Sequence, residues 1–155
     1  MIFQTQRFKI MTHNELVDLS HKFVLKNMSC GFAVKEIKTV EKEIVDVLGF
    51  GAHNHSILIE VKVSRQDFLK DAKKSFRKNP EEGVGKYRFY CCPKDLIKIE
   101  DLPNNWGLIY CENNKLEIVH NPYCKSLKGN IYTGGFNYNK DVERAIMYSA
   151  LRRQK

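Results

Sequence analysis

The nine-residue stretch SILIEVKVS, Ser56 to Ser64, most constrains what this chain can fold into. Its β-branched and bulky apolar residues are typical of a strand buried in a core, yet Glu60 and Lys62 interrupt it. Side chains alternate between the two faces of a strand, so one face is entirely apolar and is formed by Ile57, Ile59, Val61 and Val63. The other face carries both charged residues, about 7 Å apart along the strand.

The strand predicted before it, Glu43–Phe50, brings a third charged residue to the same region. Asp46 alternates in phase with Ile44 and Leu48, and it comes beside Glu60 if the two strands pair around the turn GAHNH. Two carboxylates in a half-buried site repel each other unless a cation lies between them, and such hard oxygen ligands suit Mg²⁺ or Mn²⁺. The residues therefore predict metal ligands at Asp46 and Glu60, with Lys62 beside a metal-activated water.

The remaining sequence predicts a single α/β domain that spans residues 1–155. We expect a mixed, mostly antiparallel central sheet flanked by helices. The predicted elements are a helix at 11–27 with Thr12 and Glu15 as its capping box, a meander of strands at Phe32–Ile37, Glu43–Phe50 and Ser56–Ser64, a helix at Arg65–Lys78, a strand at 86–93, a hairpin turning at Asn113-Asn114 and a last helix beginning at Lys140.

Composition limits the cellular compartment and the binding partners that we expect for this chain. No run approaches the roughly 18 apolar residues of a membrane span, and the N-terminus lacks the shape of a signal peptide, so we expect a cytoplasmic protein that does not contact a membrane. A net charge of +8 is compatible with a polyanionic partner. Five cysteines without a C-x-x-C pair predict reduced thiols. A zinc site from His53, His55 and Cys124 is the less favoured alternative.

The motif is also similar to a known one. Val45-Asp46, followed fourteen positions after Asp46 by Glu60-Val61-Lys62, resembles the signature of the PD-(D/E)xK nuclease superfamily, with valine at the usual proline. The segments EVKVSRQDFLKDAKK, KYRFYCCPKDL and GLIYCENNKLEIV resemble small MmcB-type proteins and related phage and bacterial nuclease-like proteins. This resemblance covers about residues 12 to 122, and more loosely the ending SALRR. The positions that match the family run after the motif are Ser64, Arg65, Asp67 and Asp71.

The resemblance implies a restriction-endonuclease-like fold and a metal-dependent nuclease that hydrolyses phosphodiester bonds, in DNA rather than RNA. Its setting would be DNA repair or the processing of phage or host DNA. By this resemblance Asp46 and Glu60 bind Mg²⁺ or Mn²⁺, and Lys62 is the catalytic lysine. Many members of the superfamily add a carboxylate from the first helix or strand, for which Glu15 and Glu36 are the candidates here.

In such a fold the helix after the motif lies near the site. We therefore expect contacts to the nucleic-acid backbone from Arg65, Lys70, Lys73, Lys74 and Arg77, the cations around that helix. Nucleases of this type often cut as homodimers. Two readings compete with catalysis: Glu60 and Lys62 are only the solvated face of a strand, or the domain is a non-catalytic module that binds nucleic acid or a protein. His13 and His21 are expected to face solvent, and Trp106 to pack in the core.

Overall fold

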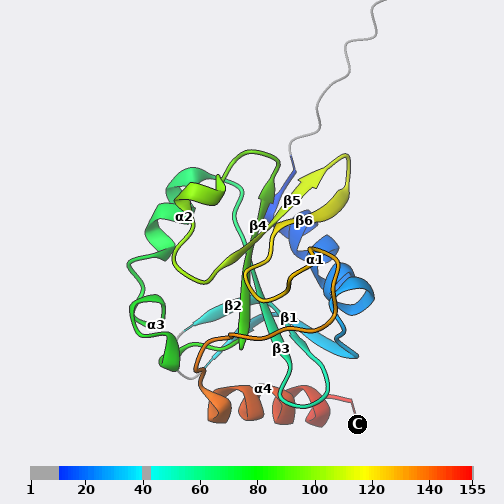
Figure 1. The fold of residues 1–155 in the computed structure, drawn as a ribbon. Helices are drawn as coiled ribbons and strands as arrows, with labels where there is room; N and C mark the ends of the chain where they lie inside the picture. The colour runs from blue at the N-terminus through cyan, green and yellow to red at the C-terminus, as the bar shows by residue number, and fades with distance from the viewer. Residues whose placement is uncertain (1–10, 40–42, 155) are drawn as a thin grey trace, which may run out of the picture.

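The computed structural model describes residues 11–39 and 43–154, which build one six-stranded sheet with helices around it (Figure 1). The strands are β1 (Phe32–Lys38), β2 (Ile44–Phe50), β3 (Ser56–Val61), β4 (Tyr87–Pro93), β5 (Gly107–Glu112) and β6 (Lys115–His120). The α-helices are α1 (His13–Asn27), α2 (Arg65–Asp71), α3 (Ser75–Lys78) and α4 (Lys140–Arg152), with short 3-10 turns η1 (Pro80–Glu82) and η2 (Ile99–Asp101). The predicted α/β architecture with a mixed sheet is confirmed.

The strands lie in space in the same order as in the chain. β1, β2 and β3 form the predicted antiparallel meander, and β5 pairs antiparallel with β6. The pairs β3–β4 and β4–β5 are parallel. Parallel neighbours need a crossover connection. The crossover from β3 to β4 contains α2 and α3, so these helices begin where β3 ends, beside Glu60 and Lys62.

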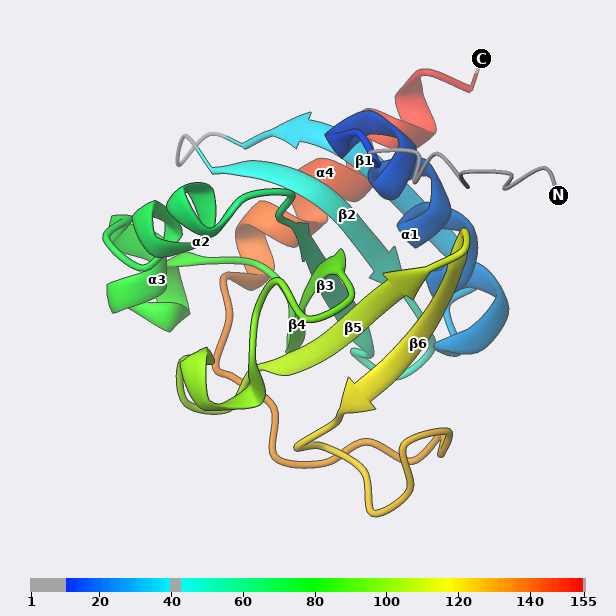
Figure 2. The same ribbon diagram turned by 90° about the horizontal axis from the view of Figure 1, so that it is seen from above.

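The two faces of β3 differ as its alternation predicts. Ile57, Ile59 and Val61 belong to an apolar cluster with Leu16 and Val17 of α1. The opposite face begins with Leu58, which belongs to a second cluster with residues of α2 and α4. Figures 1 and 2 show α1 and α4 on different sides of the sheet. Glu60 and Lys62 continue this second face toward α2, where polar contacts replace apolar packing.

Several local predictions are confirmed. The Thr12 hydroxyl caps α1 by accepting a hydrogen bond from the Glu15 N–H, 3.2 Å away. The hairpin turns at Asn113 and Asn114, whose φ values of 52° and 61° lie in the left-handed region that asparagine tolerates. Trp106 is buried and stacks on Tyr90 with ring centroids 4.3 Å apart.

The predicted continuous helix from Arg65 to Lys78 is wrong: it is broken between Asp71 and Ser75. Lys74 has extended backbone angles and is the N-cap residue of α3. In a continuous helix, neighbouring side chains are three or four residues apart, so Asp71 and Arg77 would lie on different faces. The break lets the Arg77 guanidinium turn back to within 2.8 Å of the Asp71 carboxylate.

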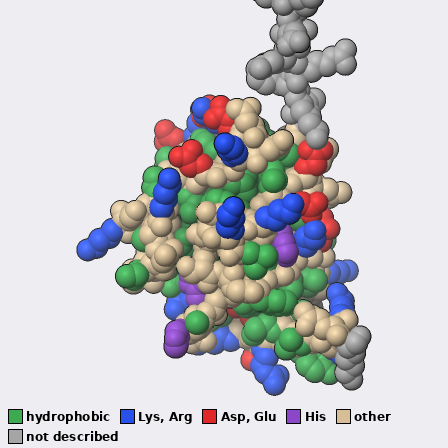
Figure 3. All heavy atoms as spheres, turned by 90° about the vertical axis from the view of Figure 1, so that its right-hand side faces the viewer, with side chains coloured by type: hydrophobic (Ala, Val, Ile, Leu, Met, Phe, Trp, Pro, Cys, Tyr) green, Lys and Arg blue, Asp and Glu red, His purple; other side chains and the backbone are tan. Residues whose placement is uncertain are grey.

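Figure 3 shows the face that carries α1. Lysine and arginine side chains are scattered over this face among acidic, neutral and apolar ones and do not form a single patch. Among the described residues, no helix is long and apolar enough to cross a bilayer. All five cysteines are free thiols, as predicted.

Candidate active site

The pairing of β2 with β3 brings Asp46 to Glu60, as predicted. Leu48 lies opposite Leu58 and Val47 opposite Ile59, so the same register puts Asp46 opposite Glu60. The Asp46 carboxylate accepts a hydrogen bond from the backbone N–H of Val61, with Oδ2 2.9 Å from the nitrogen. This bond ties the Asp46 side chain to β3 at the residue between Glu60 and Lys62.

Glu60 is buried, with 2% of its surface exposed. Its Oε1 lies 3.3 Å from Nη2 of Arg77, and its Oε2 lies 3.8 Å from Nζ of Lys62. Within the described residues, Oε1 accepts no hydrogen bond. Burial raises the pKa of Glu60 well above its ordinary value, against the opposing effect of Arg77, while Asp46 and Asp71 raise it further. Among residues 11–39 and 43–154, the carboxylate is thus held by ion pairs alone, in surroundings that disfavour its charge.

The Lys62 ammonium lies between two carboxylates. Its Nζ is 3.2 Å from Oδ1 of Asp71 and 3.8 Å from Oε2 of Glu60. Its backbone N–H donates to the carbonyl of Cys91, so the chain stays tied to β4 beyond the end of β3. Only 8% of the residue is exposed, which excludes the reading that Lys62 belongs to a solvated strand face.

Asp71, the last residue of α2, is the centre of the cluster. It is fully buried, and its Oδ2 accepts hydrogen bonds from Tyr90 O–H and from Arg77 Nε. Its Oδ1 faces Nζ of both Lys62 and Lys74, each 3.2 Å away. Burial alone would raise the pKa of Asp71, but Arg77 and Lys62, with the Tyr90 hydrogen bond, lower it well below its usual range. Asp71 is therefore a stable anion.

Sequence reasoning did not place Asp71 in the site, although the residue belongs to the run that matches the nuclease-like family. Glu43, just before β2, was missed as well. It accepts a hydrogen bond from the Arg77 guanidinium, 3.0 Å away, and another from the Val84 N–H. The spacing of Glu43, Glu60 and Asp71 along the chain does not indicate that they meet. Their shared partner is Arg77, which contacts all three carboxylates.

The structure corrects the placement of Arg77, which the sequence put among the cations around a helix. Its side chain is only 4% exposed and faces the carboxylates of Glu43, Glu60 and Asp71. The guanidinium carbon also lies 4.9 Å from the ring centroids of Phe76 and Trp106. A side chain enclosed in this way is not available to bind a phosphate from solvent.

The other predicted nucleic-acid ligands divide into two groups. Arg65 donates to the carbonyl of Leu96 and to the Asp101 carboxylate, at 3.0 and 2.9 Å, so it ties α2 to the loop after β4. Lys70, Lys73 and Lys74 are exposed on α2 and the turn after it. Lys74 also pairs with Asp71, which places it at the rim of the buried cluster.

The first turn of α1 reaches the same site. His13 is partly exposed, as expected, with 42% of its side chain accessible, but its Nε2 also lies 3.4 Å from Asp46 Oδ1. Glu15 is half-buried two residues further on. Glu36, the other candidate for an additional carboxylate, is exposed in β1. His21 is also turned inward, and its Nε2 lies 3.2 Å from the carbonyl oxygen of Ala33.

The donor chemistry fits a magnesium site that protein ligands complete only in part. Asp46 and Glu60 offer hard oxygens from adjacent strands, and each carboxylate oxygen has a second lone pair beyond its present contact. Glu60 Oε1 is buried and lacks a hydrogen bond within the described residues. Across residues 11–39 and 43–154, no three His, Cys, Asp or Glu side chains gather as a metal site. Water and substrate phosphate would have to supply the other ligands, as is usual for Mg²⁺.

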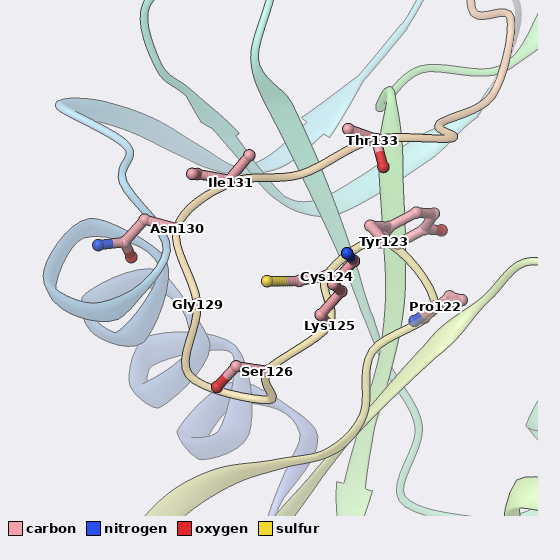
Figure 4. A pocket seen from close by; sticks show the side chains of 9 residues that line it. All are labelled: Pro122, Tyr123, Cys124, Lys125, Ser126, Gly129, Asn130, Ile131 and Thr133. Carbon is pink, nitrogen blue, oxygen red and sulfur yellow. The ribbon is translucent and has the colours of Figure 1, made fainter.

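A cavity of about 570 Å³ lies away from this cluster, in the loop from Pro122 to Thr133 (Figure 4). Tyr123 of this loop packs in the cluster under α1, on the opposite face of the sheet from Glu60 and Lys62. Figure 4 shows the sulfur of Cys124 pointing into the space that the loop encloses.

His55, one of the residues of the zinc alternative, has structural contacts. Its Nε2 lies 3.0 Å from the Met28 carbonyl oxygen, and its imidazole ring packs on Tyr87.

Comparisons with known proteins bear on the fold alone. No protein-family model matches the chain, and no curated protein matches it. A solved structure, a protein of unknown function from Silicibacter pomeroyi, is similar with a TM-score of 0.64 and 20% sequence identity. The match covers 94% of this chain and 90% of that one. Most of the chain therefore has a counterpart of similar fold.

Proposed function

We propose that this protein is a metal-dependent nuclease with a restriction-endonuclease-like fold, which cleaves DNA rather than RNA. The observation that carries the proposal is the meeting of Asp46, Glu60 and Lys62 at the end of β3, with Asp46 bonded to the strand between the other two. The resemblance of the Asp46 to Lys62 segment to the PD-(D/E)xK signature supports it. DNA repair or the processing of phage or host DNA is the setting proposed with it.

In this proposal Asp46 and Glu60 would hold Mg²⁺ or Mn²⁺. A metal held there would supply a water of lowered pKa and positive charge to offset that of the phosphate. Asp46 is kept in place by the Val61 N–H, and Glu60 by its position in the sheet. Lys62 orients the attacking water and stabilises the charge that builds up on the phosphate. Glu15, near His13 at the start of α1, is retained as the additional carboxylate.

Exposed lysines beside the site are the proposed contacts to the nucleic-acid backbone. Lys70, Lys73 and Lys74 lie on the segment that begins where β3 ends, and Lys74 reaches the buried cluster itself. Arg65 and Arg77 are removed from this group because Asp101 and the buried carboxylates hold them. Binding that depends on lysine–phosphate pairs weakens steeply with salt. A homodimer that cuts both strands remains part of the proposal.

One observation favours a second candidate, a non-catalytic module of the same fold. Glu60 already faces two internal cations, Arg77 and Lys62, so the cluster has its own counter-ions without a metal. A domain that had kept only binding would use the same exposed lysines to hold nucleic acid, or a different surface to hold a protein. The two candidates differ in whether Asp46 and Glu60 bind a divalent cation.

A cleavage and metal-binding experiment separates them. Duplex, single-stranded and branched DNAs and RNA are incubated with the protein in Mg²⁺, in Mn²⁺ and in chelator, and Mn²⁺ binding is measured by electron paramagnetic resonance. Asp46→Asn, Glu60→Gln and Lys62→Ala are compared with Glu117→Gln and Lys115→Ala. The last two are a matched control, because Lys115 and Glu117 are also two residues apart on a strand but are exposed on β6.

We expect metal-dependent cutting that all three site variants reduce by about 100-fold or more, while both control variants keep it. Mn²⁺ binding should be lost in the aspartate and glutamate variants and kept in Lys62→Ala. If the wild-type protein binds nucleic acid but neither cuts it nor binds Mn²⁺, the nuclease proposal is refuted and the non-catalytic module is favoured.

A further inference from the structure

The contact that fixes the ammonium of Lys62 is made by Asp71. Nζ of Lys62 lies 3.2 Å from the Asp71 carboxylate and 3.8 Å from that of Glu60, and only the first contact is a hydrogen bond. Lysine has a flexible four-carbon side chain, which does not hold its ammonium in one place without a partner. An anion from another element must therefore hold it.

Asp71 is itself held rigidly. Its second oxygen accepts hydrogen bonds from Tyr90 O–H and from Nε of Arg77. The Tyr90 ring is fixed by stacking on Trp106 and by an edge-on contact with Phe68, with centroids 4.3 and 5.0 Å apart. The carboxylate thus has a set orientation, with Oδ1 directed at Lys62.

We propose that Asp71 is the positioning residue of this site, which holds the Lys62 ammonium beside Glu60 but off its carboxylate. The inference rests on the proposed nuclease function and assigns a residue to it. Without Asp71, the carboxylate of Glu60 would be the nearest anion to Lys62, and their direct pairing would occupy an oxygen that the metal needs. Asp71 prevents this by giving Lys62 a closer partner.

The contacts of Asp71 show that Lys62 is not required merely to neutralise it. Arg77 already donates to Asp71, and Lys74 pairs with the same oxygen as Lys62. The Lys74 side chain is 44% exposed, so this third cation lies at the rim. Asp71 therefore keeps two cationic contacts without Lys62, although it shares Arg77 with Glu43 and Glu60. We infer that its hydrogen bond with Lys62 serves to place the ammonium.

Nuclear magnetic resonance of lysine ammonium groups tests the placement without metal or substrate. An ammonium held in a hydrogen bond exchanges its protons slowly and gives a distinct ¹⁵Nζ signal, which Lys62→Arg identifies by its loss. We expect Asp71→Asn to remove the signal or shift it to that of a free lysine. Asp67→Asn, which changes an exposed carboxylate on the same helix, should leave the signal unchanged.

Because Asp71 is buried, Tyr90→Phe serves as a second variant in case Asp71→Asn does not fold. It keeps the Asp71 charge and removes only the hydroxyl that orients it, so the Lys62 signal should broaden and exchange faster. If the wild-type protein gives no slowly exchanging Lys62 signal, the proposal is wrong. It is also wrong if the signal is unchanged in folded Asp71→Asn or, should that variant not fold, in Tyr90→Phe.

Cleavage kinetics then separate this inference from the nuclease proposal. Asp71→Asn should lower kcat by about 10- to 100-fold with KM for DNA unchanged, the usual effect of losing a group that orients a site residue. If the resonance changes as expected but the protein cuts no nucleic acid, the nuclease proposal is refuted. The placement of Lys62 by Asp71 then still holds. Cutting at full rate by Asp71→Asn would overturn the positioning role alone.

Discussion

The two ends of β3 each bury a glutamate, and they do so in different ways. At the Ser56 end, Glu143 of α4 accepts hydrogen bonds from Ser56 O–H and from the backbone N–H of Gly85, at 3.1 and 2.8 Å. At the other end, the contacts of Glu60 with described side chains are the ion pairs with Arg77 and Lys62. Burial raises the pKa of both glutamates, although Gly85 and Ser56 lower that of Glu143.

This difference shows that burial alone does not distinguish a structural acid from a functional one. The Glu143 end satisfies its carboxylate with fixed donors, which is how a fold joins a helix to a sheet. The Glu60 end gathers Asp46, Asp71 and Lys62 around a carboxylate without such donors. An arrangement that keeps several ionisable groups close together is costly for stability and is characteristic of sites with a chemical task.

The largest effect that we expect comes from removing the cation at the Glu60 end. Arg77→Met should lower the free energy of unfolding by about 3–5 kcal/mol, because Glu43, Glu60 and Asp71 lose the charge that they share. Urea unfolding at neutral pH measures it. The control is Arg65→Met, whose solvent-screened pair with Asp101 should contribute far less to stability. Equal losses in the two variants would contradict the view that the Glu60 end depends on its buried cation.

A smaller effect distinguishes the two glutamates directly. Glu143→Ala should cost about 1–3 kcal/mol, since it leaves the buried Gly85 N–H and Ser56 hydroxyl without their acceptor. Glu60→Ala removes the same volume but relieves repulsion from Asp46 and Asp71, so it should cost less. Urea unfolding of both variants under the same conditions gives the comparison. If Glu60→Ala proves the more destabilising, Glu60 serves stability and the contrast between the ends fails.

The sequence predicted those parts of this site that follow from the alternation of one strand. The position of Glu60 and Lys62 on one face, the register that brings Asp46 to them, and the strand–helix order all depend on residues close in the chain. Asp46 and Glu60 are joined by a short turn, so their meeting requires only antiparallel pairing. The hairpin at Asn113-Asn114 was predicted for the same reason, because turn chemistry is local.

The remaining partners could not be predicted in this way. Asp71, Arg77 and Tyr90 come from three different elements and meet only because the chain breaks after α2. Helical spacing favoured an unbroken helix, since Phe68, Leu69, Ala72 and Phe76 recur on one face. Helical spacing does not include tertiary contacts. The break is favoured because it lets one guanidinium reach three buried carboxylates. Tertiary electrostatics therefore overrode a local preference.

The pH dependence of stability should also differ between the ends. A carboxyl group whose pKa is raised on folding stabilises the folded state fully below the ordinary value of 4.5, and this contribution is lost as the pH rises through the folded pKa. Glu60→Gln should flatten the fall in unfolding free energy that begins as the pH rises above the ordinary value of 4.5. Glu143→Gln should flatten it less, because hydrogen bonds oppose the effect of burial there. A larger flattening in Glu143→Gln than in Glu60→Gln would mean that folding raises the pKa of Glu143 more than that of Glu60. That result would contradict the contrast between the two ends.

The smallest effect concerns the surface beside each end. Lys70 and Lys73 are exposed near Glu60, whereas Lys140 is exposed at the start of α4, near Glu143. If the Glu60 end receives nucleic acid, each lysine that pairs with a phosphate releases about one counterion. Lys70→Ala with Lys73→Ala should then reduce the slope of log affinity against log salt by about 1.8 for duplex DNA, a few-fold change in affinity at low salt. Fluorescence anisotropy from about 50 to 200 mM salt measures the slope, and Lys140→Ala should leave it unchanged. An unchanged slope in the double variant, or an equal loss in Lys140→Ala, would show that DNA does not approach the end of β3 where Asp46, Glu60 and Lys62 lie.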